Sequence, residues 1–145
     1  MADHATLIFF RSGRGNLDTA AAALANCGMS VRRMAREFGD ELTVGFRDGP
    51  ELRVAFLEGP YVRKEAEELS TGTTHAAEMS RCEVRYEILI EDLDGVLDEI
   101  NTLIDAQATL RDATDGFLFN TWNGSLQGPA KKDAEQNALE DRPCE

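Results

Sequence analysis

Three stretches of this sequence alternate apolar and polar side chains residue by residue, and this period of two limits the fold more than any other feature. Two of them, 42–47 and 52–57, are separated by a turn at Asp48-Gly49-Pro50. The third covers 81–90. Strands with one apolar face are typical of antiparallel sheets. The pattern therefore predicts a β-hairpin and a further half-buried antiparallel strand.

Further strands and helices complete an order of strand, helix, three strands, helix, strand, helix and strand. The expected strands are 6–11, 29–37, 42–47, 52–57, 81–90 and 117–122, and the expected helices are 17–26, 61–69 and 91–110. After 61–69 the sequence Ser70-Thr71-Gly72-Thr73-Thr74 either bends the helix or stops it before a restart through Met79. In 91–110, residues at spacings of three and four form the face expected to be buried: Leu93, Val96, Leu97, Ile100, Leu103, Ile104, Gln107 and Leu110.

This order predicts an α+β fold. We expect a mainly antiparallel sheet of about six strands, with two to three helices packed on one face. The ferredoxin-like split βαβ arrangement is the nearest named motif, and it is an analogy of fold that carries no function. Asn123-Gly124 is expected to end a single domain at 1–124, followed by a polar tail over 125–145.

Net charge and apolar run length exclude several classes of partner. The 145 residues, 16.0 kDa in mass, have a net charge of -12 and a pI of about 4.6, which argues against nucleic-acid binding through a basic surface. Near the start, the longest apolar run is Leu7-Ile8-Phe9-Phe10. A signal peptide needs about 7–15 apolar residues and a membrane-spanning helix about 20. We therefore expect a cytoplasmic protein that does not bind membranes.

The charge is unevenly spread along the chain. Residues 1–60 carry 7 Lys and Arg against 8 Asp and Glu, whereas residues 61–145 carry 8 against 19. The first half has a group of five arginines with Asp18 as the one acid among them: Arg11, Arg14, Arg32, Arg33 and Arg36. These arginines either form a basic corner on an acidic body or pair with its many carboxylates.

The loop Arg11-Ser12-Gly13-Arg14-Gly15-Asn16 is the most informative motif, because it leaves a strand and opens a helix. Glycines let backbone N–H groups converge, and a helix N-terminus attracts an anion. The candidate ligand-binding residues are Arg11, Gly13, Arg14, Gly15 and Asn16. However, the Walker pattern is absent, and the dinucleotide pattern has Asp18 in place of its third glycine. An ordinary tight turn is the alternative to an anion site.

The sequence contains few residues in patterns typical of catalytic or metal-binding sites. The three cysteines, Cys27, Cys82 and Cys144, form no CxxC pair, and His4 and His75 complete no zinc spacing. Cys82 with His75 is the one conceivable nucleophile and base, but Cys82 falls on the apolar face of its strand. We predict no catalytic residues, no metal and no cofactor, and the sequence favours a protein that is not an enzyme.

Two apolar side chains are predicted to lie at an interface. Leu57, in the second strand of the hairpin, is expected on the sheet face that one layer of helices leaves uncovered. Trp122, at the end of the last strand, either joins that face as a contact residue or packs in the core. Pairing of such faces predicts a homodimer.

The favoured function is a small protein-binding module whose acidic surface steers a basic protein partner, as in immunity proteins, secretion chaperones and nuclease inhibitors. One alternative is a small protein or enzyme that binds an anionic ligand at the 11–16 loop. The other is a structural homodimer.

Overall fold

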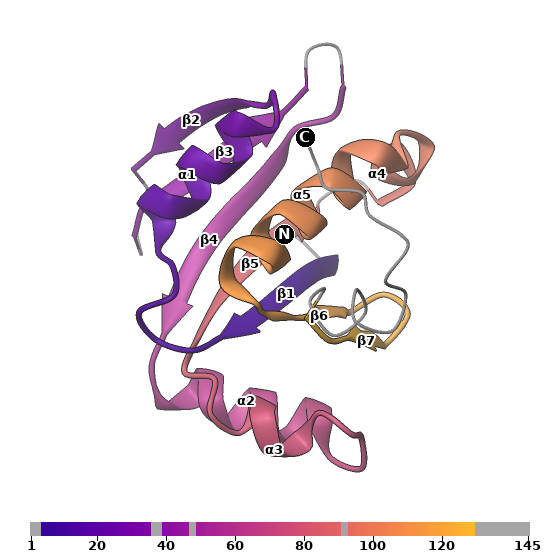
Figure 1. The fold of residues 1–145 in the computed structure, drawn as a ribbon. Helices are drawn as coiled ribbons and strands as arrows, with labels where there is room; N and C mark the ends of the chain where they lie inside the picture. Colours follow the sequence, from indigo (N-terminus) through magenta and orange to yellow (C-terminus); the bar gives the residue numbers. More distant parts are fainter. Residues whose placement is uncertain (1–3, 36–38, 47–48, 91–92, 130–145) are drawn as a thin grey trace, which may run out of the picture.

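The computed structural model describes residues 4–35, 39–46, 49–90 and 93–129. It contains one seven-stranded sheet in which every pair of neighbouring strands is antiparallel (Figure 1). The strands are β1 (His4–Phe10), β2 (Ser30–Met34), β3 (Glu41–Gly45), β4 (Leu52–Glu58), β5 (Val84–Ile90), β6 (Phe117–Asn120) and β7 (Ser125–Gln127). Their spatial order is β2-β3-β4-β5-β1-β6-β7. The α+β class and the antiparallel sheet are confirmed.

The described ranges contain five helices, which pack on the two faces of this sheet. They are α1 (Leu17–Asn26), α2 (Pro60–Ser70), α3 (Ala76–Met79), α4 (Leu93–Asp98) and α5 (Ile100–Thr114). The predicted interruption after α2 is a stop and a restart, because α3 begins after a turn. Among the described residues, no helix is both long enough and apolar enough to span a bilayer.

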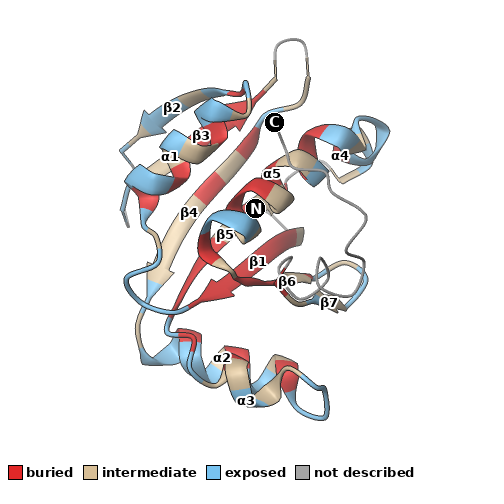
Figure 2. Ribbon diagram, viewed as in Figure 1, coloured by how far each residue is buried: buried red, intermediate tan, exposed pale blue. Residues whose placement is uncertain are grey.

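The helices do not all pack on one face of the sheet, which corrects our expectation. Ile8 and Phe10 of β1 share a buried cluster with residues of α1 and α5, whereas Phe9 lies in a second cluster with residues of α2 and α3. Successive side chains of a strand point to opposite faces, so these helix groups cover opposite faces. A continuous apolar run such as Leu7–Phe10 requires cover on both faces, and β1 is buried along nearly its whole length (Figure 2).

The second face is less completely covered than the first. On the face that α1 covers, Leu42 and Val54 are at 0% exposure, and Phe56 is partly buried. On the opposite face of the same strands, Ala55 and Leu57 remain half-buried. We call this β3–β4–β5 part of the second face the open face, defined by Arg53, Ala55, Leu57, Glu87 and Leu89.

The long predicted helix 91–110 is two helices. Glu99 leaves the helical backbone, with φ -123° and ψ 54°, and separates α4 from α5. Val96 and Leu103 are buried against the sheet, but Leu97 is 40% exposed and Ile104 is 48% exposed. The predicted apolar face is therefore wider than the part of it that the core buries.

The sheet continues past the expected end of the domain. Asn123-Gly124 belongs to a hairpin turn, in which the Gly124 N–H donates to the Asn120 carbonyl oxygen at 2.8 Å. β7 then pairs with β6, which makes seven strands and places three residues of the expected tail in the sheet. An Asn-Gly pair is a strong hairpin signal, and this one fulfils that role. The rest of the predicted tail, 130–145, lies outside the described residues.

Candidate functional site

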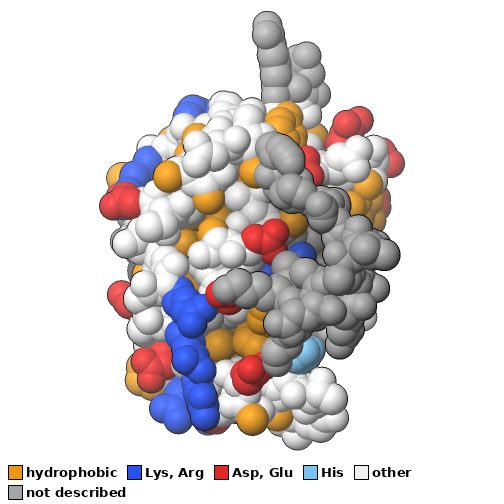
Figure 3. Space-filling model, viewed as in Figure 1, with side chains coloured by type: hydrophobic (Ala, Val, Ile, Leu, Met, Phe, Trp, Pro, Cys, Tyr) orange, Lys and Arg blue, Asp and Glu red, His pale blue; other side chains and the backbone are white. Residues whose placement is uncertain are grey.

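The 11–16 loop connects β1 to α1 through a tight turn. The Arg14 N–H donates to the Arg11 carbonyl oxygen at 3.2 Å, and Gly13 has a φ of 89°, in the left-handed region that favours glycine. Figure 3 shows a column of basic side chains on this side of the molecule, with acidic side chains beside it. The turn therefore exists as predicted, and its surroundings carry both signs of charge.

Two backbone N–H donors at the start of α1 are satisfied within the helix itself. The Thr19 N–H donates to Asn16 Oδ1 at 2.9 Å, and the Asn16 N–H donates to Thr19 Oγ1 at 2.8 Å. This reciprocal pair is a capping box. Asn16 thus has a structural role, and a ligand at this position would compete with these bonds.

Gly15 lies against a buried tyrosine. A Cβ atom at Gly15 would be 2.7 Å from the Tyr86 hydroxyl oxygen and 3.0 Å from Thr114 Cγ2. Tyr86 donates its hydroxyl proton to the Asn16 carbonyl oxygen at 2.7 Å, and burial raises the pKa of this phenol. The second glycine of the loop is therefore needed for close packing between the loop and β5.

Three of the five arginines grouped in the first half form ion pairs with separate carboxylates. Arg14 pairs with Asp115 at 2.9 Å and Arg32 with Glu51 at 3.0 Å. Arg33 pairs with Asp40 and with Asp18, and these hydrogen bonds, that of Asp40 first, raise its pKa. These contacts match the alternative in which the arginines pair with acidic residues. Arg36 lies outside the described residues.

A cavity of about 430 Å³ reaches the loop at Ser12. Arg63 of α2 contributes a cation to its lining, but Glu58 and Glu83 contribute two carboxylates. Arg11, Gly13, Arg14, Gly15 and Asn16 are absent from that lining. Anion binding at the loop stays a prediction, and these carboxylates would oppose it.

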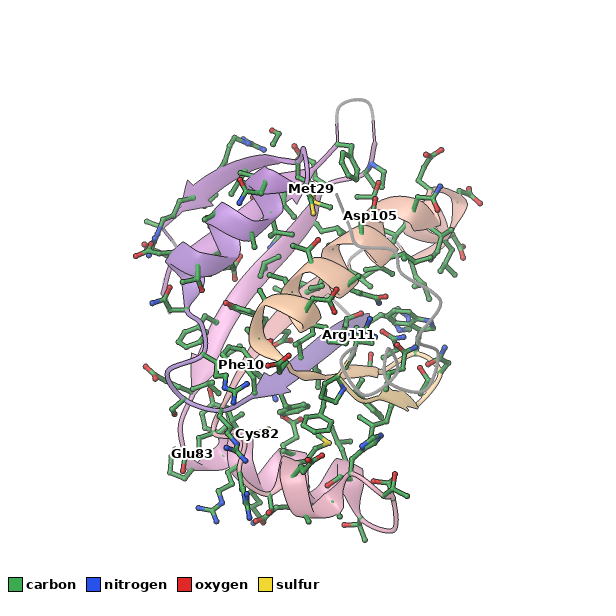
Figure 4. All side chains as sticks on the ribbon, viewed as in Figure 1. Phe10, Met29, Cys82, Glu83, Asp105 and Arg111 are labelled. Atoms are coloured by element: carbon green, nitrogen blue, oxygen red, sulfur yellow. The ribbon has the colours of Figure 1, made fainter. Side chains whose placement is uncertain are left out.

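Cys82 is buried between the sheet and the α2–α3 pair (Figure 4). Burial raises the pKa of its thiol to about 11, so the thiol is protonated near neutral pH and is a poor nucleophile. The His75 ring packs edge-on against Phe117, with ring centroids 5.3 Å apart. Within the described residues, no three His, Cys, Asp or Glu side chains are grouped so that they could hold a metal ion.

Leu57 and Trp122 do not share a surface. Leu57 lies on the open face and packs partly against the α2–α3 cluster. Trp122 follows the end of β6 and packs against the opposite cluster, with α1 and α5. Trp122 therefore follows the alternative of packing in the core, because β6 ends at Asn120 and the turn that follows breaks the alternation along the strand.

The open face holds a groove that sequence reasoning found only in part. Its volume is about 750 Å³, and its apolar lining includes Ala55, Leu57 and Leu89. The lining also includes Leu17 and Phe56, which pack on the α1 side of the sheet. Alternation in the hairpin identified Ala55 and Leu57. Leu89 lies beside Arg53 because of the β4–β5 register, which the sequence alone does not specify.

A second exposed surface lies on α4 and α5, and we call it the acidic ridge. It combines Leu97 and Ile104 with the carboxylates Asp94, Asp98, Glu99 and Asp105. No ion pair joins these four carboxylates to any other residue that the structure describes. Sequence reasoning missed the ridge because helical spacing placed both apolar residues in the core.

The described residues thus offer three candidate sites, and geometry is the one guide to their roles. No family model matches the chain, and no match is found among curated proteins or solved structures.

Proposed function

We propose that this chain is a non-enzymatic protein-binding module and that the acidic ridge binds a basic partner protein. The observation that carries the proposal is the exposure of two large apolar side chains on an acidic pair of helices. Leu97 and Ile104 are two of the three large hydrophobic residues that are exposed among the described residues. They lie seven positions apart, one on each helix.

The charge on the ridge supports a basic partner. Between Leu93 and Thr114 there are five carboxylates and one arginine. That arginine, Arg111, pairs with Asp112, one of the five. The other four, which include Asp105 (labelled in Figure 4), lack an ion pair to any described residue. Carboxylates without partners can pair with Lys or Arg of another protein without first breaking a bond of their own.

Apolar and charged groups would make different contributions to binding. Burial of Leu97 and Ile104 would supply affinity, since apolar surface removed from water contributes about 25 cal/mol per Å². The carboxylates would steer a basic partner toward the ridge and orient it. The cytoplasmic location expected from the sequence belongs to this proposal.

The anion-binding alternative has weaker support. The 11–16 loop contributes one residue to the cavity beside it, and two carboxylates line that cavity. Asn16 and Arg14 already have partners, in the capping box and in the pair with Asp115. Binding of a basic partner at the acidic ridge would not require contacts of this kind to be broken.

Affinity capture from the native cell tests the proposal with a matched set of variants. Leu97→Ser/Ile104→Ser removes the apolar pair, and Asp98→Asn/Asp105→Asn removes two charges without changing size. Tyr61→Ser is the control, because Tyr61 is 53% exposed on α2, away from the ridge. The captured partner is then purified, and its dissociation constant is measured by calorimetry with each variant.

We expect the wild type and Tyr61→Ser to bind a protein with a basic surface equally well. The double serine variant should bind at least about tenfold more weakly, a loss of about 1.4 kcal/mol. The double asparagine variant should also bind more weakly, most clearly at low salt. Equal binding by all four proteins would show that the ridge is not the binding surface.

A further inference from the structure

We infer that residues 60–79, which form α2 and α3, are a hinged cover on the second face of the sheet. An ion pair between Glu65 of α2 and Arg85 of β5 holds this cover in place. In the detached state the cover leaves the sheet while the strands stay paired. The inference does not depend on the proposed function. It rests on the buried arginine beneath α2 and on the way in which the chain enters and leaves the cover.

Both ends of the cover meet at one place on the sheet (Figure 1). Glu58, the last residue of β4, pairs with Val84, the first residue of β5, and the chain between them forms the cover. The Gly59 N–H donates to the Glu83 carbonyl oxygen at 3.3 Å, which closes the base of this segment. Gly59 has a φ of 137°, in the region that favours glycine. The cover can therefore move about this base without separating β4 from β5.

Arg85 lies beneath this cover and is the one charged residue among the buried residues that the structure describes. It is 8% exposed, and in the sheet it lies between Leu57 of β4 and Phe9 of β1. Its guanidinium carbon is 5.8 Å from the centre of the Phe9 ring. An arginine is almost never buried to this extent unless it is paired. The position of the cover therefore depends on how the charge of Arg85 is compensated.

Two carboxylates compensate this charge. Nη1 of Arg85 pairs with Glu65, and Nη2 pairs with Glu87 of the same strand at 3.3 Å. Glu87 stays beside Arg85 when the cover moves, so Glu65 is the carboxylate that joins Arg85 to the cover. A second ion pair, between Arg63 of α2 and Glu83, is 3.8 Å long and has both side chains more than half exposed. Such a pair contributes little.

The two states differ in the surroundings of Arg85. With the cover in place, Val62 and Ala66 are buried in one cluster with Phe9, and this apolar contact favours the closed arrangement. Nε of Arg85 is buried and has no hydrogen-bond partner among the described residues, so its hydration favours detachment. A buried charge that loses its partner is strongly destabilising. Removal of the Glu65 charge therefore shifts the balance toward the detached state.

Hydrogen exchange of the full chain, measured by mass spectrometry, tests this inference. Glu65→Gln removes the charge without changing the size of the side chain. We expect the amides of 60–79 to exchange at least about tenfold faster than in the wild type, because the buried cation has lost a partner. The amides of β1, β5 and α5 should keep their wild-type rates.

Glu68→Gln is the matched control. Glu68 is exposed on the same helix, and it has no ion pair to any residue that the structure describes. This variant should leave the exchange of the cover unchanged. An equal acceleration in Glu68→Gln and Glu65→Gln would overturn the inference, since the ion pair with Arg85 would then not be the cause.

Arg85→Met tests the role of the buried cation. With an apolar side chain beneath the cover, Glu65→Gln should change the exchange of 60–79 by less than about twofold. If Arg85→Met does not fold, as judged by circular dichroism, the comparison of Glu65→Gln with Glu68→Gln decides alone. Wild-type exchange of 60–79 in Glu65→Gln would overturn the inference. So would an equal acceleration in β1 and α5, which would mean that the whole fold opens, or an effect of Glu65→Gln that persists without Arg85.

Discussion

At the scale of single residues, burial changes the chemistry of one side chain that the sequence had singled out. Cys82 is 1% exposed, and burial raises the pKa of its thiol from an ordinary value of 9.0 to about 11. Neighbouring charges have smaller and opposite effects, since Arg11 lowers this pKa and Glu78 raises it. The thiol is thus a structural group whose titration is tied to folding.

The sign of this linkage gives a prediction. Below about pH 9 the thiol is protonated in both the folded and the unfolded chain, so its contribution to stability is fully present. Between about pH 9 and 11 the unfolded chain loses the proton first, and the free energy of unfolding falls as the pH rises. Urea denaturation at several pH values should show this decline in the wild type and a shallower one in Cys82→Ala.

Tyr86 adds to the same decline, because burial raises the pKa of its phenol too. The variant Cys82→Ala should therefore keep part of the slope at the most alkaline pH values. Identical slopes in the wild type and the variant would show that the Cys82 thiol titrates alike in both states.

At the scale of elements, the 11–16 loop shows what a motif can and cannot establish. Its turn and its helix start were predictable, because glycine, here Gly13, adopts the positive φ of tight turns and asparagine, here Asn16, is a preferred helix N-cap. The contact of Gly15 with Tyr86 was not predictable, because it depends on the packing of β5 behind the loop. The sequence does not show whether a loop glycine makes room for a ligand or, like Gly15, for a neighbouring side chain of the same protein.

A melting experiment tests the loop as an anion site. If the loop binds phosphate or sulfate, sulfate should stabilise the fold relative to chloride at equal ionic strength. At about 100 times the dissociation constant the gain is about 2.7 kcal/mol, which is several degrees for a domain of this size. Arg14→Ala should abolish the difference between the two salts.

Arg32→Ala is the matched control, since it also removes one exposed arginine from an ion pair, here with Glu51. It should preserve the effect of sulfate. Equal melting temperatures of the wild type in the two salts would show that the loop is an ordinary turn that binds no anion. An effect that Arg14→Ala preserves would exclude Arg14 from any anion site.

The α4–α5 segment shows a second limit. Spacings of three and four correctly indicated helix, and Val96, Leu103 and Leu110 are buried as expected. The same spacings also included Leu97 and Ile104, which are exposed. Periodicity shows which residues share a face of a helix, but the width of the buried part depends on the neighbouring elements.

At the scale of the whole molecule, net charge affects the binding of the proposed partner. A chain of net charge -12 attracts a basic protein. Raising sodium chloride from 0.01 to 0.1 M shortens the Debye length from about 30 to about 10 Å. Binding of a basic partner to the acidic ridge should therefore become weaker.

Calorimetry at the two salt concentrations measures this response as the dissociation constant of the partner. A dissociation constant that does not rise with salt would show that charge does not contribute to binding at the ridge.

The sequence was a good guide to the class of the fold and a poorer guide to its layers. Alternation in 42–57 and 81–90 predicted antiparallel strands, and β3, β4 and β5 confirm them. The apolar run Leu7–Phe10 indicates a buried strand, and a strand that is apolar on both faces needs cover on both. The location of α2 and α3 on the second face follows from that demand.

The central place of β1 also constrains the order in which the chain can assemble. Phe9 pairs with Arg85 on one side and with Phe117 on the other, so both strands that pair with β1 come from residues far along the chain. Until β5 and β6 have been synthesised, the apolar run of β1 has no strand on either side. Contacts of such long sequence separation slow folding. A nascent chain therefore exposes the apolar run of β1 without a strand partner until β5 has been synthesised, and this run is a segment that chaperones for extended apolar chains would bind.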